Sequence, residues 1–156
     1  MDSKSELRLS QVMPQLADLA RRLHDVLLQE NITIEITQGL RTVAEQNALY
    51  AEGRTSPGRI VTHAQAMESW HVLGCAIDVA PFNNSIPDWD SRHPAWARIV
   101  AVGESLGLVS GISWKDEPHF ELTGKYPSDP TQEVQDLFTS GGLPAVWAAV
   151  VQSDNA

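Results

Sequence analysis

The sequence predicts an α+β domain in which helices flank a small, mainly antiparallel sheet. Helical patterns lie at both ends of the chain, and short strand-like stretches lie in its middle. The 156 residues are enough for one compact domain with a full-sized core, and no repeat, low-complexity tract or linker divides them. We therefore expect residues 1–156 to form a single domain.

The N-terminal part of the chain is expected to form a long helix followed by a strand. Apolar side chains recur at steps of three and four over residues 7–29, which predicts an amphipathic helix. Pro14 lies inside this stretch and is expected to break or kink the helix, because proline lacks the N–H that a helix interior needs. Residues 32–37 alternate apolar and polar side chains and are rich in β-branched residues, which predicts the first strand.

A second helix and a second strand follow. Thr42 is a good N-cap and Glu45 stands where it completes a capping box, so a helix should run from here to Gly53. Residues 54–70 are polar and interrupted by Gly and Pro, which indicates a loop. Residues 75–80 form a short, mostly apolar stretch, which predicts a strand.

The remaining elements are short and are bounded by Gly or Pro. They are a loop at residues 81–91, a helix at 94–106, strands at 109–112 and 119–122, and helices at 130–138 and 144–151. Gly107 ends the first of these helices, Asp129 caps the next, and Gly141-Gly142 breaks it. Pro118 stands just before the last strand, a position that tolerates proline. The final five residues are expected to fray.

Composition and charge exclude several classes of function. The formal charge of −9 argues against a nucleic-acid partner, because such binding depends on neutralising phosphates with Lys and Arg. No run of about 20 apolar residues is present, so no membrane insertion is expected. The N-terminal residues lack the apolar core of a signal peptide, so we expect synthesis in the cytoplasm. Cys75 is the one cysteine, which excludes an intramolecular disulfide and suits a small buried side chain.

Two short stretches carry residues suited to metal chemistry. Residues 69–78 read Ser-Trp-His-Val-Leu-Gly-Cys-Ala-Ile-Asp, and residues 116–119 read Asp-Glu-Pro-His. Two imidazoles, from His71 and His119, and the carboxylate of Asp78 are enough for a three-ligand zinc site with a free fourth position. Asp116 adds a spare carboxylate that could take a proton from a zinc-activated water.

The combined motif points to a metal site more specifically than any single residue in it. A histidine taken alone is more often a structural hydrogen-bonding residue. Gly74 and Ala76 keep the backbone and one strand face small, and Asp78 lies on the same face as Ala76. An aspartate buried on a strand must be paired or bound to a metal, because an isolated charge there costs too much. The residues therefore favour a zinc hydrolase.

With these motifs the chain resembles the zinc peptidases that include D-alanyl-D-alanine carboxypeptidases, vancomycin-resistance dipeptidases and phage L-alanyl-D-glutamate endolysins. The matching segments are residues 39–42, 45–50, 53–55, 69–78 and 116–122. The endolysin branch fits best, because it pairs Arg-Thr-x-Ala-Glu-Gln with Asp-x-Pro-His-Phe-Glu-Leu. The resemblance spans roughly residues 35–125, in the family's order and spacing, and extends weakly to the Gly-Gly-Leu-Pro segment at residues 141–144. It implies a fold shared with Hedgehog signalling domains and with the D-Ala-D-Ala peptidases, with the zinc site on the sheet.

The resemblance assigns roles residue by residue. It makes three residues the zinc ligands: His71, Asp78 and His119. Asp116 occupies the position of the catalytic acidic residue, three residues before the last ligand. Arg41 matches the arginine that steadies the substrate or polarises its carbonyl, and Ser69 either orients the metal loop or touches substrate.

The chain also departs from its relatives. His63 stands where they usually carry asparagine, and Gln65 where many carry a basic residue. His63 is expected to be either a polar contact at the rim of the site or a solvated loop histidine. Residues 111–116 form a shorter connection than in many relatives, at a place that shapes the substrate cleft.

Four further side chains near the motifs have two interpretations each. Glu117 competes with Asp116 as the base, although its spacing does not match the family. Glu121 either orients a metal ligand as an outer hydrogen-bonding partner or is an ordinary exposed carboxylate. Trp70 and Trp114 either line the groove or pack against the sheet.

We therefore expect a monomeric zinc endopeptidase that cuts peptidoglycan stem peptides between L-alanine and D-glutamate, with no separate wall-binding domain. Synthesis without a signal peptide suits a phage or prophage lysin released by a holin, or a cytoplasmic enzyme that recycles wall peptides. A D,D-carboxypeptidase or dipeptidase is the alternative within enzymes. A zinc-stabilised binding module without catalysis is the alternative outside them, because fold alone does not decide function.

Overall fold

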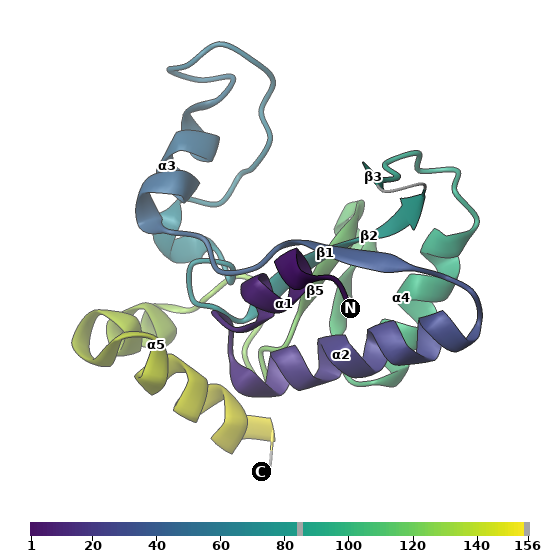
Figure 1. Cartoon of the computed structure of the whole chain (residues 1–156). Coiled ribbons are helices and arrows are strands. Elements are labelled where there is room, and N and C mark those ends of the chain that lie inside the picture. Colours follow the sequence, from purple (N-terminus) through teal and green to yellow (C-terminus); the bar gives the residue numbers. More distant parts are fainter. Residues whose placement is uncertain (84–85, 155–156) are drawn as a thin grey trace. The chain divides into compact units, whose positions relative to one another are not determined.

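In the computed structural model, which describes residues 1–83 and 86–154, the strands form an antiparallel sheet, as predicted (Figure 1). Its strands are β1 (Ile34–Gln38), β2 (Ala76–Asn83), β3 (Ile86–Pro87), β4 (Val109–Gly111) and β5 (Asp116–Glu121). Their spatial order is β1-β2-β5-β4, and β3 pairs with the end of β2. The sheet therefore places β2 and β5, which carry Asp78 and His119, next to each other in its centre.

The chain divides into two compact units, each made from two separate stretches of sequence. The sheet unit comprises Met1–Gly39 and Ala76–Leu122, and the helical unit comprises Leu40–Cys75 and Thr123–Ala156. Within the described residues, every helix is too short or too polar to cross a bilayer. Helices precede and follow the strands along the chain, which confirms the predicted α+β class.

The helices of the sheet unit are α1 (Ser3–Leu9), α2 (Pro14–Gln29) and α4 (Ala95–Ser105). The helix predicted over residues 7–29 is broken before Pro14, one of the two outcomes expected there, because proline begins α2 at a position where its missing N–H is not needed. The first helix starts earlier than predicted, since the Asp2 carboxylate accepts hydrogen bonds from the N–H groups of Lys4 and Ser5. Helices α2 and α4 lie side by side on one face of the sheet (Figure 1).

The strand boundaries differ from the predicted ones around the prolines. Strand β5 begins at Asp116 rather than His119 and so contains Pro118. The β4–β5 register shifts between Ser110 and Gly111, and this irregularity accommodates a residue that cannot donate to the ladder. The loop predicted at residues 81–91 is partly wrong, because β2 continues to Asn83 and β3 follows it; residues 84–85 of that loop lie outside the described part.

The helical unit contains α3 (Val43–Ala51) and α5 (Gln132–Asp154), with a short 3-10 turn at Ala66–Glu68 in the predicted loop. The capping box of Thr42 and Glu45 is present, as predicted. The helix expected to start at Pro130 starts at Gln132, because the first helical hydrogen bond runs from the Gln135 N–H to the Thr131 carbonyl. It breaks at Gly142, where φ is 64°, and then continues, so residues 152–154 are helical rather than frayed; residues 155–156 are not described.

Candidate metal centre

Asp78 and His119 meet on neighbouring strands of the sheet unit. They are paired residues of β2 and β5, and their Oδ1 and Nδ1 atoms are 3.5 Å apart. The alternation of β2 buries Ile77 and Val79 completely and turns Asp78 to the other face, where its side chain is 23% exposed. The sheet pairing therefore brings together two candidate ligands that lie far apart in the sequence.

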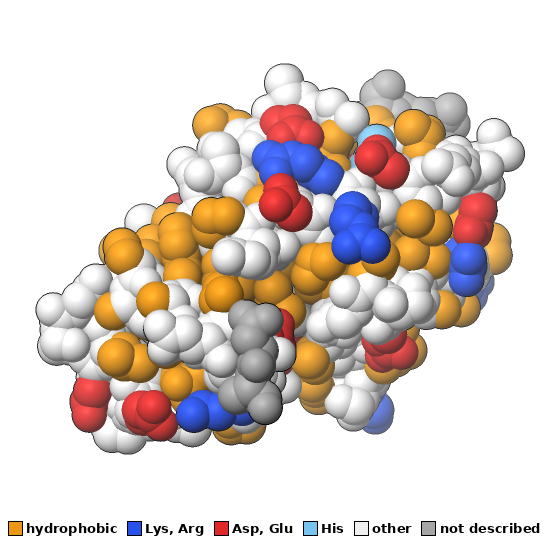
Figure 2. Space-filling view, turned by 90° about the horizontal axis from the view of Figure 1, so that it is seen from below, with side chains coloured by type: hydrophobic (Ala, Val, Ile, Leu, Met, Phe, Trp, Pro, Cys, Tyr) orange, Lys and Arg blue, Asp and Glu red, His pale blue; other side chains and the backbone are white. Residues whose placement is uncertain are grey.

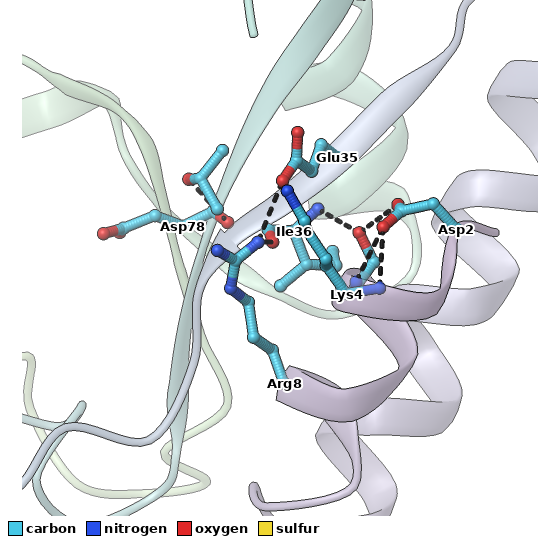
Figure 3. A network of polar contacts seen from close by, with 8 residues as sticks. Asp2, Lys4, Arg8, Glu35, Ile36 and Asp78 are labelled. Carbon is cyan, nitrogen blue, oxygen red and sulfur yellow. Dashed lines mark hydrogen bonds and ion pairs between the residues drawn. The ribbon is translucent and has the colours of Figure 1, made fainter. Parts of the chain in front are cut away.

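A network of polar contacts supports the strand beside Asp78 (Figure 3). The Thr37 hydroxyl on β1 donates to the Asp78 carbonyl oxygen at 3.2 Å. Arg8 on α1 donates to the Glu35 carboxylate at 2.9 Å and to the Ile36 carbonyl oxygen at 2.6 Å. The Asp78 carboxylate points away from this network, so α1 and β1 fix its backbone and leave its acid group directed elsewhere.

His71 lies on a tight turn of the helical unit and is buried. The turn is closed by backbone hydrogen bonds from the Val72 N–H to the Ser69 carbonyl at 3.0 Å and from the Gly74 N–H to the His71 carbonyl at 3.2 Å. Gly74 adopts φ +67°, a conformation that L residues rarely take, which explains the glycine of the motif. The Arg41 N–H also donates to the His71 carbonyl at 3.1 Å, so the backbone of the motif arginine is tied to this turn.

The ligand-type atoms of His71, Asp78 and His119 all lie within 4.8 Å of one another. Two imidazole nitrogens and one carboxylate oxygen form a donor set that suits zinc and leaves one tetrahedral position open. These are the three residues predicted from the sequence to hold a metal.

Glu121 is buried behind His119, so its interpretation as an exposed carboxylate was wrong. Its residue exposure is 1%, and its Oε2 accepts a hydrogen bond from His119 Nε2 at 2.9 Å. Its other oxygen, Oε1, has no hydrogen-bond partner in the described part of the chain. The contact engages Nε2 and leaves Nδ1 on the side of Asp78, which is the arrangement by which outer carboxylates orient metal-binding imidazoles.

His119 is held between two carboxylates, and this changes its protonation. Burial disfavours the charged imidazolium, but the hydrogen bonds and charges of Asp78 and Glu121 outweigh it and raise the pKa of His119 to about 9. In the metal-free protein the ring is therefore protonated at neutral pH. A metal ion that takes Nδ1 must displace that proton.

We expect the metal-free protein to lose stability as the pH rises. A folded pKa of about 9 above the ordinary 6.5 means that the contribution of His119 is complete below pH 6.5 and lost through pH 9. The loss from this group is on the order of 3 kcal/mol at most. Urea unfolding of chelator-treated protein across this range measures it, and a His119→Gln variant should show a flatter dependence. An equally steep dependence in that variant would contradict the assignment.

Asp116 and Glu117 differ in exposure. Asp116 is exposed at the first residue of β5, whereas Glu117 is half-buried. Asp116 lies opposite Gly111 of β4, and a Cβ atom on Gly111 would collide with the Asp116 carbonyl oxygen. A residue without a side chain is therefore required for this approach of β4 to the start of β5.

The other predicted side chains fall into buried and exposed groups. Trp70 is buried and its Nε1 donates to the Pro127 carbonyl at 3.1 Å, so it packs rather than lines a groove. Trp114 is exposed and lies edge-on to the His119 ring, with centroids 5.9 Å apart. Ser69 is buried, and His63 is exposed.

Gln46 has a role in the site that was not predicted from the sequence. It is fully buried on α3, and its Oε1 accepts a hydrogen bond from Arg41 Nη1 at 2.7 Å. Its Nε2 donates to the Ala64 carbonyl at 2.8 Å, so one side chain holds both the arginine and the following loop. The signal available was its place in the Glu45-Gln46 segment of the motif, directly after the capping-box glutamate.

Comparison with known proteins gives consistent matches. Residues 1–130 match the family model described as phage L-alanyl-D-glutamate peptidase. The peptidoglycan L-alanyl-D-glutamate endopeptidase CwlK of Bacillus subtilis (strain 168) is 35% identical over 125 residues, covering 72% of this chain and 74% of CwlK. The L-alanyl-D-glutamate peptidase of Escherichia phage T5 is 30% identical over 122 residues, covering 78% of this chain and 82% of the phage protein. The crystal structure of the Serratia marcescens L-Ala D-Glu endopeptidase ChiX superposes with a TM-score of 0.60 at 25% identity, covering 79% of this chain and 89% of ChiX.

Proposed function

Because this chain belongs to the phage L-alanyl-D-glutamate peptidase family, we propose that it acts on bacterial peptidoglycan as an endopeptidase that hydrolyses the stem peptide between L-alanine and D-glutamate. The observation that carries the proposal is the convergence of His71, Asp78 and His119 within 4.8 Å in a chain of this family. The enzyme is a hydrolase of cell-wall peptides. It acts either on the cell wall, after holin-mediated release, or on wall peptides that are recycled in the cytoplasm.

We propose that His71, Asp78 and His119 hold one zinc ion. The donor set fits zinc, and the buried Glu121 on Nε2 of His119 is the kind of outer partner that such a ligand needs. When bound, zinc would lower the pKa of a water molecule and polarise the scissile carbonyl.

The chain's own residues supply the proton transfers. Asp116 is exposed and so is accessible to substrate and water; it takes a proton from the attacking water and returns it to the leaving amine. The Arg41 guanidinium, held by Gln46, steadies the substrate or its developing negative charge. The burial of Ser69 and the hydrogen bond to its carbonyl favour a role in shaping the turn of His71 over contact with substrate.

Analysis of the products tests the reaction. Digestion of purified peptidoglycan should expose new D-glutamate N-termini and leave L-alanine attached to muramic acid, as mass spectrometry of the fragments can show. Release of free D-alanine without new D-glutamate termini would instead identify a D,D-carboxypeptidase. No release of either kind by folded, zinc-loaded protein would identify a binding module.

A further inference from the structure

The C-terminal helix α5 contacts the turn that carries His71. Trp147 lies on α5 after the break at Gly142, and its Nε1 donates to the Leu73 carbonyl at 2.9 Å. Its ring lies directly over Gly74, because a Cβ atom on Gly74 would meet three atoms of the indole at 3.0–3.3 Å. Trp147 therefore contacts the turn both by a hydrogen bond and by close packing.

Besides the Trp147 indole, the Leu73 carbonyl accepts a hydrogen bond from the Cys75 thiol, a weak donor whose Sγ lies 3.5 Å away. Leu73 is completely buried, and a buried carbonyl without a partner costs free energy comparable to a lost hydrogen bond. The backbone bonds that close the turn use the carbonyls of Ser69, Trp70 and His71 instead. The indole N–H of Trp147 thus completes a turn whose conformation sets the direction of the His71 imidazole.

A second indole makes the reciprocal contact. Trp70, adjacent to His71, donates from its Nε1 to the Pro127 carbonyl at 3.1 Å. The segment around Pro127 is in turn joined to α5, because the Lys125 N–H donates a hydrogen bond to the Ser153 hydroxyl oxygen at 3.1 Å. Two indole-to-carbonyl bonds of opposite direction therefore connect the turn with the C-terminal stretch of the same unit.

We propose that Trp147 is a positioning residue for His71, acting through the Leu73 carbonyl and the backbone of Gly74. This inference rests on the proposed function, in which His71 is a metal ligand. Trp147 lies on α5 beyond residue 130, where the match to the family model ends. Loss of the indole N–H should loosen the turn and weaken metal binding without removing any ligand.

A Trp147→Phe variant tests this, because phenylalanine keeps an aromatic ring over Gly74 and removes the N–H. The control is Trp89→Phe, which changes an exposed tryptophan of the sheet unit. We expect the zinc affinity of folded Trp147→Phe, measured by chelator competition, to fall by roughly 10-fold, the lower end for outer-shell changes. The Trp89→Phe variant should match the wild type, and amide exchange of Gly74 and Cys75 should accelerate in Trp147→Phe alone.

Each outcome is decisive. A lower melting temperature with unchanged zinc affinity and unchanged exchange at Gly74 would show a merely structural tryptophan and overturn the inference. A wild-type protein that binds no zinc would instead contradict the proposed function. In that case the exchange measurement still decides whether Trp147 holds the turn.

Discussion

Replacing His71 by alanine is expected to abolish peptidoglycan hydrolysis and to remove most of the bound zinc. The change leaves two protein ligands, Asp78 and His119, where a catalytic zinc site uses three. The fall in zinc affinity should exceed the roughly 10- to 100-fold caused by changes in outer-shell partners. Metal analysis of the purified protein and turbidity loss of a cell-wall suspension measure the two effects.

The matched control for this experiment is His63→Ala. His63 is an exposed histidine of the preceding loop and is not among the proposed metal ligands. Its replacement therefore removes the same chemical group from outside the proposed site. Zinc content and hydrolysis should both stay at the wild-type level. Full zinc occupancy in His71→Ala would show that the ligand set is wrong, whatever happens to activity.

Replacing Asp116 by asparagine is expected to separate chemistry from metal binding. The side chain keeps its shape and loses its ability to accept a proton, so hydrolysis should fall by about 10²- to 10⁴-fold, the usual contribution of a general base. Zinc content should not change, because Asp116 is exposed and is not one of the three converging ligands. Steady-state cleavage of a soluble stem-peptide fragment, together with metal analysis, measures both quantities.

Glu117→Gln is the control for Asp116→Asn. It neutralises the neighbouring carboxylate, which is half-buried, by an equally small change. We expect nearly normal turnover. If Glu117→Gln were inactive and Asp116→Asn normal, Glu117 rather than Asp116 would be the general base.

The fold class, and the face of its strand on which Asp78 lies, could be predicted from short-range patterns. Alternating residues in β2 place Asp78 on the face opposite Ile77 and Val79, and that alternation is readable from the sequence. The pairing of Asp78 with His119 depends on which strands neighbour each other, a property of the whole sheet. It was reachable only through the resemblance of both motifs to one family.

Features that depend on distant packing were left open or missed. The sequence left Glu121 open between a group that orients a ligand and an exposed carboxylate, because its burial depends on the position of β5 between β2 and β4, which the local sequence does not give. Gln46 could be read as a polar residue of an ordinary helix, because its partners Arg41 and Ala64 come from before and after that helix. Pro14 was left open between a break and a kink, since proline disturbs the helix interior in either way.

The close approach of β4 to the start of β5 limits how this chain can vary over generations. Gly111 has no metal-binding or proton-transferring group, yet any replacement would push against the backbone oxygen of Asp116 rather than against a side chain that can rotate away. In a library carrying every amino acid at position 111, active variants should therefore be as rare as in a library at a proposed metal ligand such as His71. The path of the neighbouring backbone, rather than any chemical group of its own, therefore fixes glycine at position 111. A substitution there would displace Asp116 even though Asp116 itself is unchanged.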